Sequence, residues 1–287
     1  MNAATLITLL DDSDTLVEQE LLNFYTTNFS DENLNVLESA STKISTQRIE
    51  FYQQLTNEYK KAWFEESFKK VLKNSSIENI DLIVDILLSM NSLFENGNQI
   101  SSAKLWIQKI SNEISEKSKK VKDDSESLYL LSQSLFFQNN LNGNHKNYYD
   151  PQNSDLTNVI KTRLGIPISL SMLIFIIARK SGIQCYPANI PRHFMLYFPF
   201  EVPTFMDCFN FGSLLPPEEV ETFLNQININ KNPTEFIETN FLVILKRWFQ
   251  NIIYIYSSRN QTEKLATFYS YIDQINSVMG INDLMDQ

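Results

Sequence analysis

The sequence predicts a mostly helical α+β protein, in which a central buried helix packs on a small antiparallel sheet and further helices precede and follow this core. All nine prolines lie between Pro151 and Pro233, and four of the six glycines lie between Gly143 and Gly212. Residues that break helices are therefore concentrated in the middle of the chain. The run over 167–180 is apolar on nearly every side, as expected of a helix surrounded by other elements.

The chain before residue 140 predicts a series of amphipathic helices. Apolar residues recur there at intervals of three and four, which places them on one face of a helix. The predicted helices span 3–10, 14–27, 46–73, 80–94, 101–120 and 125–137. The first pair resembles the start of a HEAT-type repeat, but such repeats need several stacked copies, and two ordinary packed helices explain the pattern equally well.

The middle segment predicts short elements around the central helix. Asn153 and Ser154 are expected to cap a short helix that Gly165 terminates. Pro167 then begins the central helix, in the first turn where proline is tolerated, and Gly182 ends it. Strands rich in Tyr, Phe, Met and Ile are expected over 184–189, 193–198 and 204–209.

After Pro233, two apolar stripes with alternating spacings of three and four predict an antiparallel helical hairpin joined by residues 257–261. The hairpin resembles a single tetratricopeptide-type pair, and both a peptide-binding groove and simple packing onto the middle segment stay open. The predicted division is a helical region over 1–120, the core over 121–215 and a second helical region over 216–287. Whether the N-terminal helices form their own domain or wrap the core also stays open.

Composition excludes several classes of function. The 34 acidic and 24 basic residues give a net charge of −10, which argues against a binder of nucleic acid or of anionic membranes. No apolar run approaches the ~20 residues of a membrane span, and the N-terminus lacks a signal peptide's basic flank and cleavage site. The two cysteines, Cys185 and Cys208, do not make a disulfide scaffold, so we expect a cytoplasmic protein.

No cofactor or metal is expected either. The two histidines, His145 and His193, do not stand in a metal-ligand spacing. The six glycines form neither of the glycine-rich loops that bind nucleotide phosphates.

The middle segment also carries short motifs in a fixed order. They are Asn142-Gly143-Asn144, Tyr149-Asp150-Pro151-x-Asn153-Ser154, Arg163-x-Gly165-Ile166-Pro167-Ile168-Ser169-Leu170, Gly182-Ile183, Pro191-x-His193-Phe194, Asp207-x-Phe209-x-x-Gly212, Leu245-x-Arg247 and Asn251-x-x-x-x-Tyr256. With this order, residues 125–279 resemble the transglutaminase-like superfamily, and in particular its SirB-type core of bacteria with a helical tail. The resemblance implies a papain-like core, in which a strand opening with His and a strand carrying Asp follow the central helix.

Catalytic members of this superfamily use a Cys-His-Asp triad, with the Cys at the N-terminus of the central helix. The resemblance implies that His193 is the histidine and Asp207 the orienting carboxylate. It places the nucleophile position on Pro167, which has no nucleophilic group. Whether the protein is an enzyme therefore stays uncertain, and the interpretation as an inactive member is favoured.

Other side chains near this position are weak replacements. Ser171 lies on the same helix face as Pro167 but about 6 Å deeper along the axis, which suits a polar partner of His193 better than a nucleophile. Cys208 is expected on the opposite strand face from Asp207. The direction of Cys185 is not fixed by the sequence.

The segment between Asp155 and Glu201 contains no acidic residue but five basic ones. Arg163 and Arg192 could hold a carboxylate or phosphate beside His193, or the bases could instead pair with Asp150, Asp155 or the acidic helical parts. The resembled family more usually has Gly in place of Arg192, so this side chain could cover the site. The cleft or ligand-binding candidates are Asn153, Arg163, Gly165, Ser171 and Arg192.

Three functions remain open. The favoured one is a non-catalytic transglutaminase-like protein that binds a protein or peptide partner, with its oligomeric state undetermined. The alternative is an amide-directed hydrolase or acyl transferase that uses His193 and Asp207 with water or an unconventional nucleophile. The third is a helical scaffold, for which neither Arg163 nor His193 should line an accessible pocket.

Overall fold

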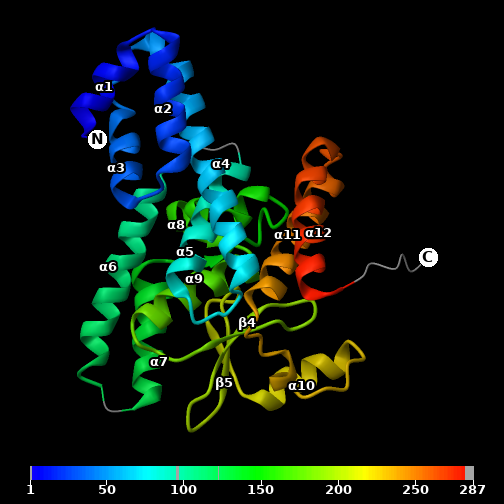
Figure 1. Ribbon diagram of the computed structural model, residues 1–287. Coiled ribbons are helices and arrows are strands. Elements are labelled where there is room, and N and C mark those ends of the chain that lie inside the picture. The colour runs from blue at the N-terminus through cyan, green and yellow to red at the C-terminus, as the bar shows by residue number, and fades with distance from the viewer. Residues whose placement is uncertain (1, 95–96, 122, 282–287) are drawn as a thin grey trace.

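The computed structural model describes residues 2–94, 97–121 and 123–281 (Figure 1). Its α-helices are α1 (Ala3–Asp11), α2 (Thr15–Thr27), α3 (Asp31–Ala40), α4 (Ile49–Lys73), α5 (Ile80–Ser89), α6 (Ile100–Ser118), α7 (Asp124–Ser132), α8 (Leu156–Thr162), α9 (Pro167–Lys180), α10 (Pro217–Gln226), α11 (Phe241–Ser258) and α12 (Leu265–Met279). Its strands are β1 (Asn142–Gly143), β2 (Leu164–Gly165), β3 (Tyr186–Ala188), β4 (Met195–Phe198), β5 (Thr204–Asp207) and β6 (Ser213–Leu215). None of the helices in these ranges is both long and apolar enough to cross a bilayer.

Helices α1 to α7 confirm the predicted helical N-terminal part, with α3 as an addition. Polar side chains of Asp14, Ser30 and Asn79 accept hydrogen bonds from the first turns of α2, α3 and α5, which explains where these helices begin. Helices α1 to α3 gather at one end of the molecule, and the sheet with α10 lies at the other (Figure 1).

The strands β3 to β6 form an antiparallel sheet in sequential order, and β1 and β2 form a separate parallel pair. Side chains alternate between the two faces of the sheet. Leu196 and Met206 join the apolar cluster around α9, whereas Met195 and Phe205 join a second cluster with Val220 of α10. The predicted central helix on a small antiparallel sheet is thus confirmed.

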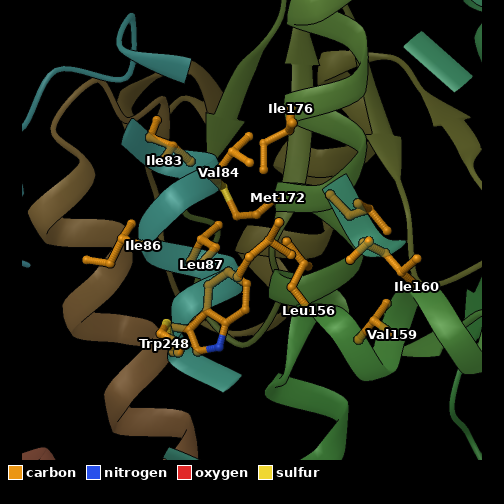
Figure 2. Close-up of a cluster of buried hydrophobic side chains, with 14 of the residues drawn as sticks. Ile83, Val84, Ile86, Leu87, Leu156, Val159, Ile160, Met172, Ile176 and Trp248 are labelled. Atoms are coloured by element: carbon orange, nitrogen blue, oxygen red, sulfur yellow. The ribbon is translucent and has the colours of Figure 1, made fainter. Parts of the chain in front are cut away.

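Helix α9 is buried from Pro167 to Ala178, as its apolar sequence predicts. Figure 2 shows side chains of α5, α8 and α9 converging with Trp248 of α11 in one apolar cluster. The indole Nε1 of Trp248 donates to the carbonyl of Ser154 at 3.1 Å. The same cluster of buried apolar residues extends from Leu6 in α1 to Ile275 in α12.

A buried polar network crosses this core. Lys60 of α4 donates to Oδ1 of Asn91 at 2.9 Å, and Nδ2 of Asn91 donates to Oδ2 of Asp155 at 3.0 Å. The backbone N–H and the hydroxyl of Thr157 also donate to Asp155. Burial lowers the pKa of Lys60, and the charges of Glu38 and Asp155 oppose that shift. The network therefore joins the N-terminal helices to the segment that precedes α9.

The predicted caps of α8 are wrong at both ends. Asp155 accepts from the backbone N–H two residues further on and is the N-cap, while Asn153 and Ser154 belong to a preceding 3₁₀ turn. Arg163 ends the helix in the left-handed conformation, with φ of 66°. Gly165 lies in β2 instead, where a Cβ would come 2.8 Å from the hydroxyl oxygen of Ser169. Close packing explains the glycine better than helix termination does.

Helices α11 and α12 form the predicted antiparallel hairpin, with the Phe249 and Phe268 ring centroids 5.7 Å apart. The hairpin also packs on α4 of the N-terminal part. Tyr271 contacts the ring of Phe64 at 5.2 Å, and its hydroxyl donates to Glu65.

Candidate functional site

His193 and Asp207 meet at one end of the sheet. Nε2 of His193 lies 2.8 Å from Oδ2 of Asp207, and the two side chains are 14% and 8% exposed. His193 precedes β4, and Asp207 is the last residue of β5. Nε2 is buried, and its contact with Asp207 has the distance of an ion pair but not the geometry of a hydrogen bond.

The end of β5 holds the Asp207 carboxylate in place. Oδ1 accepts from the backbone N–H groups of Phe209 and Asn210, both at 3.1 Å, and Oδ2 accepts from Nδ2 of Asn210 at 2.7 Å. Burial alone would raise the pKa of Asp207, but His193 and the Asn210 donors outweigh it and hold that pKa below its ordinary value. The structure thus presents a preorganised carboxylate to the imidazole.

The backbone before β4 turns sharply to place His193. The His193 N–H donates to the carbonyl of Ile190 at 3.0 Å, with Pro191 and Arg192 at the two central turn positions. Arg192 has φ of 62°, so this arrangement has the features of a type II turn, which favours Gly at that position. An arginine there costs about 1 kcal/mol of backbone strain. Its side chain is exposed beside His193.

Arg247 of α11 holds this turn through hydrogen bonds. Its Nη1 donates to Oδ1 of Asn189 and, at 2.9 Å, to the carbonyl of Ile190, and its Nη2 donates to the carbonyl of His193 at 2.8 Å. Burial lowers the pKa of Arg247 to about 10, opposed by nearby Tyr148, so the guanidinium is charged at neutral pH. Arg247 is therefore a positioning residue that the sequence analysis did not single out, although its Leu-x-Arg motif was the available signal.

Aromatic rings extend from the end of β5 across the adjoining surface. The His145 ring lies 4.3 Å from that of Phe209, which also meets Tyr148 at 5.7 Å. Tyr148 contacts Tyr149, and Tyr149 contacts Tyr254 of α11 at 5.8 Å. Within the described residues, no group of three or more His, Cys, Asp or Glu side chains is arranged to hold a metal ion.

Asn153 supports the loop that carries these rings. It is buried, and its Nδ2 donates to the carbonyls of Asn147 and Tyr148 at 2.7 and 3.0 Å. Gly143 lies at the start of this loop. A side chain is not tolerated there, because a Cβ would lie 2.5 Å from the carbonyl oxygen of Phe209. The structure thus places Asn153 behind the surface, holding the loop.

Pro167 occupies the first position of α9 and is buried. The backbone N–H of Ile166 donates to the Ser169 hydroxyl at 3.0 Å, so Ser169 closes this end of the helix. The helix start therefore combines a residue without a nucleophilic group and a hydroxyl already engaged with backbone.

The remaining candidate nucleophiles lie inside the core. Ser171 is fully buried and donates to the carbonyl of Phe194 at 3.2 Å. Cys185 and Cys208 are free, fully buried thiols, and burial raises the pKa of each. Among the described residues, no thiol or hydroxyl hydrogen-bonds to the His193 ring, and Nδ1 has no hydrogen-bond partner. The geometry of an activated nucleophile is not formed.

The basic residues between Asp155 and Glu201 make two kinds of contact, with acidic side chains and with an aromatic ring. Arg179 pairs with Glu78, and Lys180 pairs with Asp81 at 2.5 Å, so these two cations are neutralised by acids of the N-terminal part. Arg163 instead places its guanidinium over the Trp106 ring of α6, 4.3 Å from the centroid, and contacts neither His193 nor Asp207.

Arg163 also lines a surface pocket of about 400 Å³ together with Lys161. The scaffold hypothesis required that neither Arg163 nor His193 line an accessible pocket, so this hypothesis is wrong. Of the two interpretations left open for the basic stretch, joint binding by Arg163 and Arg192 beside His193 is not supported, because only Arg192 is adjacent to His193 in the turn.

Comparisons with known proteins find one matching family and several relatives. Residues 102–250 match the family model described as the transglutaminase-like superfamily. A UPF0162 protein of Xylella fastidiosa (strain 9a5c) is 32% identical over 139 residues, which is 46% of this chain and 50% of that protein. F-box only protein 21 of Homo sapiens is 33% identical over 111 residues, 36% of this chain and 18% of that protein. No solved structure matches. The match thus spans half the length of the Xylella relative and a smaller share of the human one.

Proposed function

The chain belongs to the transglutaminase-like superfamily, and from this premise we propose that it is a non-catalytic member that binds a protein or peptide partner through the surface around His193. The observation that carries the proposal is that the buried central helix begins with Pro167, the residue to which the family resemblance assigns the nucleophile position. The raised pKa values of Cys185 and Cys208, both caused by burial, support it.

The surface beside His193 suits a peptide. Tyr148, Tyr149 and Tyr254 are 37%, 50% and 61% exposed and contact one another in series. Tyrosine offers large contact area with few rotatable bonds, so ordering it on binding costs little entropy. The exposed Arg192 adds a cation in the turn that precedes β4.

The finer assignments are part of the same proposal. We infer a SirB-type member with a tetratricopeptide-like α11–α12 hairpin, supported by the UPF0162 relatives and by the hairpin's packed rings. The division at residues 120 and 215 is likewise proposed. A matching segment makes up half of a UPF0162 protein and 18% of F-box only protein 21, which supports a module carried in chains of different length.

We infer a cytoplasmic location from the two thiols. Both are free, which is the state that a reducing compartment maintains.

A displayed peptide library tests the binding proposal. Peptides enriched on the wild-type protein should lose about tenfold or more in affinity for the double variant Tyr149→Ala/Arg192→Ala, measured by fluorescence anisotropy. The matched control is Tyr269→Ala/Arg259→Ala, which removes an exposed tyrosine and arginine at the α11–α12 hairpin. Equal affinity for both double variants would contradict the proposed surface.

The second candidate is a hydrolase or acyl transferase in which His193 and Asp207 activate water. The Nδ1 atom of His193, without a hydrogen-bond partner among the described residues, favours it, because Asp207 already faces the other ring nitrogen. Ammonia release from glutamine peptides, or amide cleavage, that His193→Ala abolishes and Cys185→Ser/Cys208→Ser leaves intact would establish this candidate. The non-catalytic proposal would then fail.

A further inference from the structure

The Arg163 pocket lies away from the contacts of His193. The loop over 97–99, the first turns of α6 and the end of α8 enclose about 400 Å³. This volume lies in the range of sites that take small molecules. Trp106, Lys161 and Arg163 supply its aromatic and charged wall.

The described residues that line this pocket include two cations and no carboxylate. Nζ of Lys161 donates to the neutral side-chain oxygen of Asn98 at 2.9 Å. Arg163, the C-cap of α8, donates through Nη1 to the carbonyl of Ile160. Neither cation pairs with an acidic group of the described residues, so the positive charge of the pocket is not neutralised from within the described protein.

A second pocket shows the opposite arrangement. It holds about 570 Å³ beside Trp63, and its two lysines both meet carboxylates. Lys104 pairs with Asp85 at 2.8 Å and with Asp31, and Lys180 pairs with Asp81. The Arg163 pocket thus differs from the pocket beside Trp63 in that its cations face no carboxylate among the described lining residues.

The Arg163 side chain is held in one position by its backbone conformation and by its contact with Trp106. Its backbone has φ of 66°, where a residue other than Gly is strained, and its guanidinium stacks on Trp106. Burial lowers the pKa of Arg163. Nε and Nη2 have no acceptor among the described residues, so two donors of a partly buried cation are left for a ligand.

We propose that this pocket binds a small phosphomonoester, whose phosphoryl oxygens accept hydrogen bonds from Nε and Nη2 of Arg163 and from Nζ of Lys161. The planar guanidinium fork matches two phosphoryl oxygens at once, and the lysine adds a point charge. The pocket volume leaves room for a small organic group beyond the phosphoryl group. The site is independent of the peptide surface around His193.

Calorimetric titration of the full chain with inorganic phosphate and with glycerol 3-phosphate tests the proposal. Arg163→Gly removes the guanidinium and suits the left-handed backbone, and Lys161→Gln removes the second cation. Each is expected to weaken binding of both probes by about tenfold or more. Arg259→Gly is the control, because it removes an exposed arginine after α11 that does not line this pocket, and it should bind the probes like the wild type.

Two further readouts locate the ligand. The indole N–H signal of Trp106, assigned with Trp106→Phe, should shift on titration while those of the buried Trp63 and Trp248 do not. Glycerol 3-phosphate should bind more tightly than sulfate. Unchanged affinity in Arg163→Gly, equal loss in Arg259→Gly, equal binding of sulfate, or no binding at millimolar concentration would each overturn the proposal.

Discussion

Two buried clusters of charged groups in this protein are built in opposite ways. In the helical part, Asn91 stands between Lys60 and Asp155, and hydrogen bonds connect all three in the interior. At the end of the sheet, His193 touches Asp207 directly, keeps 14% of its side chain exposed and leaves Nδ1 without a partner in the described structure. The first cluster stabilises the fold. In the second, the Nδ1 atom of His193 has no partner among the described residues and is available to a ligand or substrate.

Removing the lysine should break the first cluster. Lys60→Met leaves Asp155 buried without its opposing charge, and we expect a loss of about 3–4 kcal/mol in the free energy of unfolding, measured with urea. Lys61→Met changes the exposed neighbouring lysine of α4 and should cost less than about 0.5 kcal/mol. Similar losses in both variants would contradict a special role for the network.

Removing Arg247 should destabilise the turn that holds His193. Arg247→Met deletes hydrogen bonds to Ile190, His193 and Asn189, and we expect a loss of about 2–3 kcal/mol in unfolding free energy. The ring signals of His193 in the NMR spectrum should broaden or move as well. Arg259→Met, an exposed arginine after α11, should change neither quantity.

The contribution of the Asp207 carboxylate to stability should depend on pH. The folded-state pKa of Asp207 is lowered, so its contribution is complete above the unfolded value near 4 and is lost as pH falls through the folded value. Asp207→Asn should therefore be less stable than the wild type by about 1–2 kcal/mol at pH 7, with the gap closing below about pH 4. Urea unfolding across this range measures it, and a gap independent of pH would refute the assignment.

The smallest expected effect has the opposite sign. Arg192→Gly removes the strain at φ of 62° and should stabilise the protein by up to about 1 kcal/mol in thermal unfolding. At the same time it should weaken peptides selected on the His193 surface. A stabilised variant with unchanged peptide binding would show that the strained arginine has no part in recognition.

Local patterns predicted much of this fold. The apolar stripes of α4, α5, α11 and α12 predict each helix and its buried face. Apolar residues three and four positions apart form such a stripe, and this pattern depends only on residues close together in the sequence. Helix α3 was not predicted, and α10 was given no bounds within the predicted helical region over 216–287, because their apolar residues are few and their burial depends on distant partners such as β5 and α6. The caps of α8 were misplaced because Asn153 and Asp155 are equally good caps in isolation, and tertiary contacts use them differently.

The candidate site was predictable where it followed an ordered motif. The contact of His193 with Asp207 joins two motifs that the sequence presents in order. The stacking of Arg163 on Trp106 was not predictable, because it joins residues of two different helical segments and no local spacing encodes it. Arg247 escaped for the same reason, since its acceptors lie more than fifty residues earlier in the chain.

The contact between α4 and α12 sets an order of events during synthesis. Tyr271 meets Glu65 across 206 residues of chain and also packs on Phe64 and Phe68. At ordinary translation rates, roughly 10–40 s separate the emergence of these two segments from the ribosome. The α12-facing side of α4 is therefore uncovered for most of translation, and a nascent chain arrested before α12 presents a hydrophobic surface on which chaperones can act.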